Sequence, residues 1–332
     1  MEVFRYYEAD LVVAMVETIV TEIYELMKYY ENDGLLKIMP AFRMNSPPQL
    51  DYIPNHEALS LNQESNAHAC LYEYKENTDF IAFIDYDDIL LTTHINYFDN
   101  FKALSAKMPT AGVFLINRLP AISKIDSYPT SFSPSRLIQY MKYQNEIDNV
   151  TKFHTPTKFF VIPHKVATIS IHNGLAMEKS YLKKVQTDSN ELFITHVHND
   201  YYSNENNDSF AHLQTFNGDP SKIINSDHIN ESFTNFLKNN NIKQIYQRLP
   251  VKKHYINDLI KCSIKMRRRV MQHEHRRFNF CLTHAICPLS DVKISCIIAQ
   301  LKYASHEISK NVIWHEFSES YFDKSQNGCL IY

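Results

Sequence analysis

The sequence predicts an α/β protein, with a mostly parallel sheet flanked by helices and a mainly helical C-terminal extension. The first observation is a strand, helix, strand succession: residues 3–7 and 35–42 have strand-like composition, and residues 12–30 carry apolar side chains at helical spacing. The second is that strand-like and helix-like stretches keep alternating up to about residue 202. The third is a change of pattern from about residue 228, after which helix-like stretches dominate. Such alternation is typical of a parallel sheet covered by helices.

The length of 332 residues allows one large domain with an extension. A stretch rich in Asn, Asp and Ser at residues 203–227 indicates a loop or a boundary. We therefore expect an α/β domain over residues 1–210 and a mainly helical extension over residues 211–332. The other elements expected in the first domain are helices at 58–78, 97–107 and 134–145 and strands at 80–84, 112–119, 157–174 (one or two) and 191–202.

The composition is that of an ordinary globular protein, with 44% hydrophobic and 21% charged residues. Lys and Arg number 34 against 37 Asp and Glu, and this near-balance gives no indication of a nucleic-acid-binding surface. The chain has only five glycines, without a GxGxxG or Walker-type loop. A nucleotide-using enzyme of this composition would therefore bind phosphate through a metal ion.

The six cysteines form no CxxC pair, and five of them follow residue 260. In a cytosolic protein they would be buried thiols, whereas in a secreted protein they could form disulfides, with a connectivity that the sequence does not give. The N-terminus has no basic segment followed by a long apolar one, so neither a signal peptide nor a membrane anchor is expected in this chain.

Three carboxylates, Asp85, Asp87 and Asp88, directly follow an apolar strand-like run at residues 80–84. The simplest interpretation is a strand that ends in an acidic turn. A second is a divalent cation site, because an Asp-x-Asp turn lets two carboxylates approach one hard cation. A calcium loop is not expected, since Leu90 stands where such a loop needs glycine.

A third interpretation is a phosphatase of the haloacid dehalogenase type. The segment FIDYDDILL resembles the first motif of that family, with Asp85 as nucleophile and Asp87 as acid and base. The later acidic motifs of the family are not found, because no apolar strand leads into Asp219 or Asp227.

Two histidines, His196 and His198, stand at alternate positions near the end of an expected strand, so they point to one face. A neutral imidazole is a suitable third ligand for a borderline cation such as Mn²⁺. The expected metal ligands are therefore Asp85, Asp87 and His196, with His172 as a weaker candidate of the same kind.

Four segments, taken in order, resemble glycosyltransferase family 92: residues 61–71, 80–90, 158–174 and 194–200. The resemblance implies a GT-A-like fold and a metal-dependent galactosyltransferase that uses UDP-galactose. It places the donor site on Gln63, Asp85, Lys158 and His198. Further positions that correspond to the family pattern are Cys70, Asp87, Asp88, Pro163, His172 and His196.

The chain also departs from that pattern. Val197 and His198 stand where the family has Tyr and Arg, Asp88 replaces Glu, and Ala69 replaces Asp. The first strand of a GT-A domain is expected to be missing. These departures leave open a catalytically inactive relative that binds glycan or protein.

For an active enzyme, the resemblance implies transfer of a hexose from a UDP-sugar to a glycan acceptor, with inversion and with Mn²⁺ or another divalent cation. A carboxylate would remove the proton of the acceptor hydroxyl. The candidates are Asp188, Glu191 and Asp200, among which the sequence does not decide. The resemblance further implies a type II membrane protein of the Golgi, held by an anchor that this chain does not show.

Overall fold

The computed structural model describes most of the chain. The described ranges are residues 1–43, 62–123, 132–139, 141–143, 157–198, 223–250, 292–310 and 312–326, with single positions between 255 and 290 and residues 328–329. By its internal contacts the chain forms two compact units: residues 1–12 with 67–247, and residues 13–66 with 248–332. Each unit combines distant parts of the chain, which differs from the division at residue 210 that the sequence suggests.

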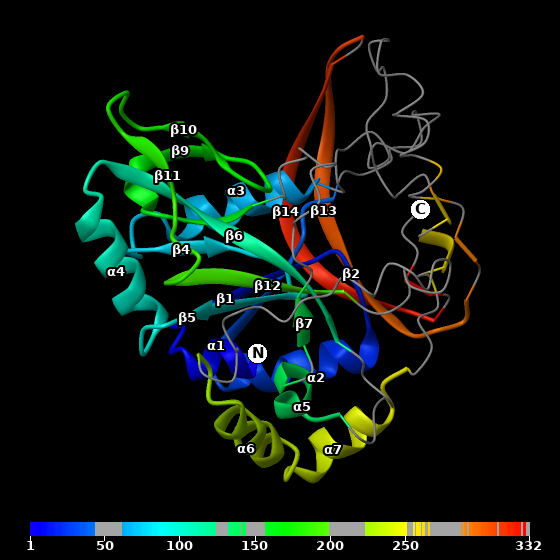
Figure 1. Cartoon of the computed structure of the whole chain (residues 1–332). Helices are drawn as coiled ribbons and strands as arrows, with labels where there is room; N and C mark the ends of the chain where they lie inside the picture. Colours follow the sequence, from blue (N-terminus) through cyan, green and yellow to red (C-terminus); the bar gives the residue numbers. More distant parts are fainter. Residues whose placement is uncertain are drawn as a thin grey trace. The chain divides into compact units, whose positions relative to one another are not determined.

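The first unit contains a seven-stranded sheet built around the 13-residue strand β6 (Figure 1). The N-terminal half of β6 pairs with β8 and β11, and its C-terminal half pairs with β12 and β7. Strand β4 extends the sheet beyond β8, and β5 extends it beyond β12. The bounds are β4 Ile81–Phe83, β5 Asp88–Thr92, β6 Ala111–Ser123, β7 Met141–Tyr143, β8 Lys158–Val161, β11 Lys183–Gln186 and β12 Leu192–His198.

This sheet is mixed, so the prediction of a mostly parallel sheet is wrong. Only β11 and β12 run parallel to β6, whereas the pairings β4–β8, β8–β6, β7–β6 and β5–β12 are antiparallel. Alternation along the sequence counts strands and helices, but it does not give the direction of each strand. Strand β5, which begins at Asp88 itself, was also not expected.

Both faces of this sheet are covered, as the fully buried strand β8 shows. Phe160 stacks between Phe101 of α4 (Tyr97–Lys107) and Phe114 of β6, with ring centroids 4.0 and 4.4 Å apart. On the opposite face, Phe159 and Val161 belong to a core cluster with Leu71 of α3 (Gln63–Tyr74). A strand covered on both sides reads as a continuous apolar run, and β8 is such a run apart from its first residue, Lys158.

Further helices contribute to the core cluster between the sheet and α4. Tyr7, next to α1 (Glu2–Tyr6), and Ile229 of α6 (Ser226–Phe236) belong to the same core cluster as Phe101 and Phe160. The remaining helices and short strands of the unit are α5 Pro134–Gln139, α7 Asn240–Gln247, the 3₁₀ turn Pro163–Lys165, β9 Val166–Ile169 and β10 Gly174–Met177.

The N-terminal elements differ from the sequence prediction. Residues 3–7, expected as a strand, fall mainly in α1, and the expected helix over residues 12–30 begins only at Thr21. Before it lie β1 (Val12–Val16) and β2 (Thr18–Val20), followed by α2 (Thr21–Asn32) and β3 (Leu36–Pro40). The segment 12–20 is rich in Val, Ile and Thr, and this β-branched composition favours strands although its apolar spacing also fits a helix.

The second unit contains a three-stranded sheet in the order β14–β13–β2 and the pair β1–β3. Strands β13 (Cys296–Ser309) and β14 (Val312–Ser325) form a long antiparallel hairpin. The prediction of a mainly helical C-terminal region therefore holds for α6 and α7 and is wrong for this hairpin. Its sequence gives little signal because half of β13 and most of β14 are exposed and the turn has no glycine. Two disulfides, Cys262–Cys287 and Cys296–Cys329, lie in this unit.

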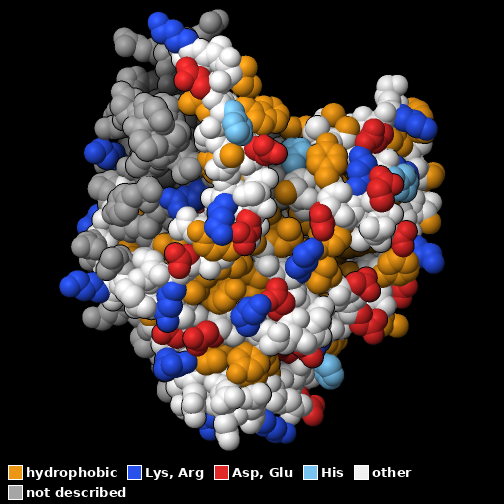
Figure 2. All heavy atoms as spheres, turned by 180° about the vertical axis from the view of Figure 1, so that it is seen from behind, with side chains coloured by type: hydrophobic (Ala, Val, Ile, Leu, Met, Phe, Trp, Pro, Cys, Tyr) orange, Lys and Arg blue, Asp and Glu red, His pale blue; other side chains and the backbone are white. Residues whose placement is uncertain are grey.

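The described surface agrees with the near-balanced charge of the sequence. On the face seen in Figure 2, acidic and basic side chains intermingle, and neither sign gathers into one large patch. Among the described residues, no helix has the length and hydrophobicity needed to cross a bilayer.

Candidate active site

The acidic turn connects β4 to β5 in the first unit. Asp88 N donates a hydrogen bond to the Asp85 carbonyl (3.1 Å), and Asp85 N donates to Asp88 Oδ2 (3.2 Å). These two bonds close the turn and set the exposure of its three carboxylates. The Asp88 side chain is 0% exposed, Asp85 is 32% exposed and Asp87 is 56% exposed. The turn therefore presents one buried and two accessible carboxylates.

His196 reaches this turn from the neighbouring strand. In the antiparallel ladder of β12 and β5, His196 lies opposite Asp88. Its Nδ1 is 2.9 Å from Asp88 Oδ1 and 3.6 Å from Asp87 Oδ2. This register brings His196 to the acidic turn, whereas the predicted role of His196 as a metal ligand stays a prediction.

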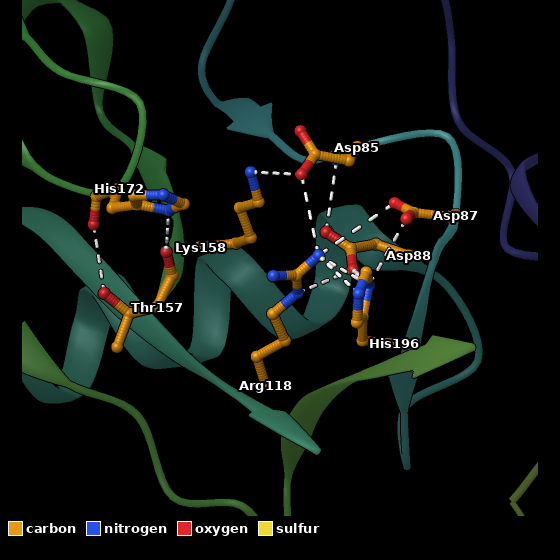
Figure 3. Close-up of polar contacts among 8 residues, drawn as sticks. All are labelled: Asp85, Asp87, Asp88, Arg118, Thr157, Lys158, His172 and His196. Carbon is orange, nitrogen blue, oxygen red and sulfur yellow. Dashed lines mark hydrogen bonds and ion pairs between the residues drawn. The ribbon is translucent and has the colours of Figure 1, made fainter. Parts of the chain in front are cut away.

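Arg118 of β6 lies among the three carboxylates and was not identified from the sequence (Figure 3). Its Nε donates to Asp88 Oδ1 at 2.9 Å, and its Nη2 lies 3.2 Å from Nε2 of His196, which can accept a hydrogen bond while Nδ1 donates to Asp88. The same Nη2 lies 3.6 Å from Asp85 Oδ2 and 4.0 Å from Asp87 Oδ1. The only available signal was an arginine inside the apolar strand GVFLINRL, where a charge needs a partner.

Lys158 supplies a second cation from β8. Its Nζ is 2.7 Å from Asp85 Oδ2, and its side chain is 1% exposed. A buried ammonium requires a counter-charge, and Asp85 provides it. Three carboxylates thus face two basic side chains, which explains how like charges can crowd in one turn.

His172 lies at the edge of this group, in the loop between β9 and β10. Its Nδ1 is 3.1 Å from the Thr157 carbonyl, and Thr157 Oγ1 donates to the His172 carbonyl at 3.0 Å. Desolvation, and then the charge of Lys158, lower the pKa of His172, although the bond to Thr157 and the charge of Asp85 act in the opposite direction. His172 therefore favours its neutral form beside this basic group.

Asp88 remains ionised despite its burial. Desolvation raises the pKa of this carboxyl, but the hydrogen bond from His196, the charge of Arg118 and the hydrogen bonds from Arg118 and the Asp85 backbone together outweigh it. The result is a pKa below the ordinary aspartate value. A buried, ionised carboxylate is a strong ligand for a cation.

Two of the three candidates for the catalytic base do not join this group. Asp188 and Glu191 precede Leu192, the first residue of β12. His196 lies four residues after Leu192, which is about 13 Å along the strand. Asp188 accepts hydrogen bonds from Asn190, and Glu191 pairs with Lys107 at 2.6 Å. Asp200 lies outside the described residues.

The remaining predicted site residues are placed as follows. Gln63 begins α3 and belongs to the second compact unit. His198 is the last residue of β12, and its side chain lies outside the described part of the structure. The roles of Gln63 and His198 in donor binding stay predictions.

Asp87, Asp88 and His196 form a candidate cation site. One ligand atom from each residue lies within 4.8 Å of the others. Two carboxylates and an imidazole suit a borderline divalent cation such as Mn²⁺, so the donor set fits the expected metal. It differs from the predicted set in one member, since Asp88 takes the place of Asp85, which pairs with Lys158.

The sequence model of glycosyltransferase family 92 matches residues 1–259 of this chain. The chain belongs to glycosyltransferase family 92. It is 25% identical over its whole length to the Caenorhabditis elegans glycosyltransferase family 92 protein F59C6.8, of which the match covers 64%. It is 22% identical over 95% of its length to the family member F13G3.3 of the same organism, of which 63% is covered. The chain thus spans somewhat less than two thirds of these relatives.

Family membership lends no support to the phosphatase interpretation. That interpretation also required later acidic residues to meet Asp85. Asp227 instead lies in the first turn of α6, and Asp219 lies outside the described residues.

Proposed function

We propose that this protein transfers a hexose, expected to be galactose, from a UDP-sugar to a glycan acceptor with inversion at the sugar carbon. The observation that carries the proposal is the meeting of Asp87, Asp88 and His196 with the cations of Arg118 and Lys158 in one small region. A diphosphate leaving group needs positive charge close to ligands that hold a metal. This region offers both.

Asp87, Asp88 and His196 would hold Mn²⁺, which offsets the charge of the diphosphate when the glycosidic bond breaks. The residues around them fix this arrangement. Asp88 keeps its negative charge inside the protein because His196 and Arg118 bond to it. Lys158 holds Asp85 in place and brings a buried positive charge toward the donor site.

The proton of the acceptor hydroxyl must pass to a base as the new bond forms. Asp188 and Glu191 lie at the far end of β12 and therefore carry little support for this role. Asp200, which follows β12 in the sequence, stays a prediction.

Calorimetry tests the donor site directly. We expect UDP and UDP-galactose to bind the wild-type protein in the presence of Mn²⁺, and binding to disappear in Asp87→Asn, which removes one ligand charge. Asp188→Asn is the matched control, since it removes a carboxylate at the other end of β12, and its binding should equal that of the wild type. Wild-type protein that binds neither compound would contradict the proposal.

We further propose that the protein matures in the secretory pathway, where the family resemblance points to the Golgi and to a type II membrane protein. The support is the two disulfides among the described residues, because such bonds persist in oxidising compartments. Thiol labelling with and without reductant should show four additional reactive cysteines after reduction.

A non-catalytic relative that binds glycan without turnover is the second candidate function. The position of Arg118 favours it, because this cation already contacts the carboxylates that a metal would need. The same calorimetry separates the two, since a non-catalytic relative would bind glycan but not UDP-galactose.

A further inference from the structure

The Arg118 guanidinium group lies among all four potential ligands, which are the three carboxylates of the acidic turn and the His196 ring. Arg118 Nη2 bonds to the His196 ring and lies 3.6 Å from Asp85 and 4.0 Å from Asp87, while Nε of the same side chain bonds to Asp88 (Figure 3). Hard divalent cations need ligand oxygens at about 2.0–2.6 Å. A cation bound by Asp87, Asp88 and His196 would therefore need ligand atoms that the Arg118 guanidinium group already contacts.

The charges lead to the same conclusion. Asp85, Asp87 and Asp88 carry three negative charges, and Arg118 and Lys158 offset two of them. A cluster with one remaining negative charge attracts a divalent cation far less than a cluster with two. Arg118 also repels a divalent cation directly. Its side chain is only 13% exposed, so solvent screens the repulsion between the two positive charges weakly.

We infer that Arg118 is a positioning residue that takes the place of the divalent cation in the metal-free protein and competes with it for Asp87, Asp88 and His196. The inference rests on the proposed metal-dependent function and adds to it a residue that sets metal affinity. Arg118 keeps the turn and His196 assembled without metal, and it leaves their ligand atoms when the metal binds. Metal binding is then coupled to displacement of the Arg118 guanidinium group.

A purely structural role for Arg118 makes the opposite prediction. If the guanidinium only holds the turn together, its removal disorders the ligands and weakens metal binding. If it competes, its removal strengthens metal binding although the metal-free protein becomes less stable. The sign of the change in metal affinity therefore separates the two roles.

The experiment measures Mn²⁺ binding by electron paramagnetic resonance on the full chain as wild type, Arg118→Met and Lys75→Met. Lys75 is the matched control because its side chain is also 13% exposed and ion-paired, but its partner is Glu178. Both variants lose one positive charge within the same compact unit. We expect Arg118→Met to bind Mn²⁺ at least about tenfold more tightly than the wild type, and Lys75→Met to equal the wild type.

Thermal unfolding gives a second readout, since a ligand that binds only the folded state stabilises it more when it binds more tightly. Mn²⁺ should raise the midpoint temperature of thermal unfolding more for Arg118→Met than for the wild type. Equal or weaker Mn²⁺ binding by Arg118→Met would overturn the inference, as would an equal gain in Lys75→Met.

A measurement on the wild type keeps the inference testable if Arg118→Met does not fold. The Nε–H resonance of Arg118, assigned by its loss in Arg118→Lys, should shift on addition of diamagnetic Mg²⁺ as the bond to Asp88 breaks. An unchanged resonance at saturating Mg²⁺ would overturn the inference. UDP-galactose binding in the presence of a chelator is judged separately. Binding without metal would retain the donor site but contradict its metal dependence, whereas the Mn²⁺ titrations alone decide the competition.

Discussion

Two lysine–carboxylate pairs of this protein have the same N–O distance of 2.7 Å and very different surroundings. Lys158 pairs with Asp85 in the first unit, where the lysine side chain is 1% exposed. Lys302 pairs with Glu319 across the hairpin of the second unit, where both side chains are more than half exposed. Exposed pairs contribute little because water screens them, whereas breaking a buried pair leaves a charge without hydration. Distance alone therefore does not show which charges hold the protein together.

Arg118→Met should have the largest effect on stability in metal-free protein. It leaves Asp88, whose side chain is 0% exposed, without its guanidinium partner. Removal of one partner of a buried ion pair costs about 3–5 kcal/mol. Urea unfolding of the metal-free protein measures this loss, and a change of less than about 1 kcal/mol would contradict the importance given to burial.

Lys158→Met should have an intermediate effect. The substitution removes the ammonium group but leaves Asp85, which is 32% exposed and can be partly hydrated. Loss of a hydrogen bond to a charged group costs about 1.5–3 kcal/mol. The same urea titration should place this variant between Arg118→Met and the wild type.

The pH dependence of stability should show the contribution of Asp88 in metal-free protein. Its pKa in the folded state is below its ordinary value, so the ionised carboxylate stabilises the fold above that ordinary value. This contribution is lost as the pH falls from the ordinary aspartate range through the lowered pKa of the folded state. Asp88→Asn should therefore flatten the acid limb of a plot of unfolding free energy against pH, and an unchanged acid limb would exclude Asp88 as its source.

Lys302→Met should have the smallest effect. The pair with Glu319 is solvent-exposed on both sides, and hairpin hydrogen bonds hold the two strands without it. We expect the midpoint of urea unfolding to equal that of the wild type within error. A loss as large as that of Lys158→Met would show that exposure is a poor guide to the importance of an ion pair here.

The sequence indicated several residues of the candidate site because these residues carry local signals. Asp85, Asp87 and Asp88 interrupt an apolar run, and His196 stands at the end of another, so each was recognised before their meeting could be seen. Lys158 entered only through the family resemblance. Arg118 was missed because a single arginine in a strand does not show its partners, which come from β5 and β12.

Parts of the fold were not predicted, because the sequence leaves strand directions and some element types open. The segment 12–20 satisfies both a helical and a strand interpretation, and β-branched side chains decide in favour of strands. The directions of β4, β5 and β8 depend on pairings between distant residues. The β13–β14 hairpin has neither a glycine turn nor a buried face along most of its length, so its sequence gives no clear strand pattern.

The most direct test of the central claim is a crystal structure of the protein with Mn²⁺ and UDP, with data collected for anomalous scattering from manganese. The account predicts an anomalous peak bounded by Asp87, Asp88 and His196, with the diphosphate beside it and the Arg118 guanidinium moved away from Asp88. A guanidinium group that still bridges Asp88 and His196, with no manganese peak at the acidic turn, would contradict the account.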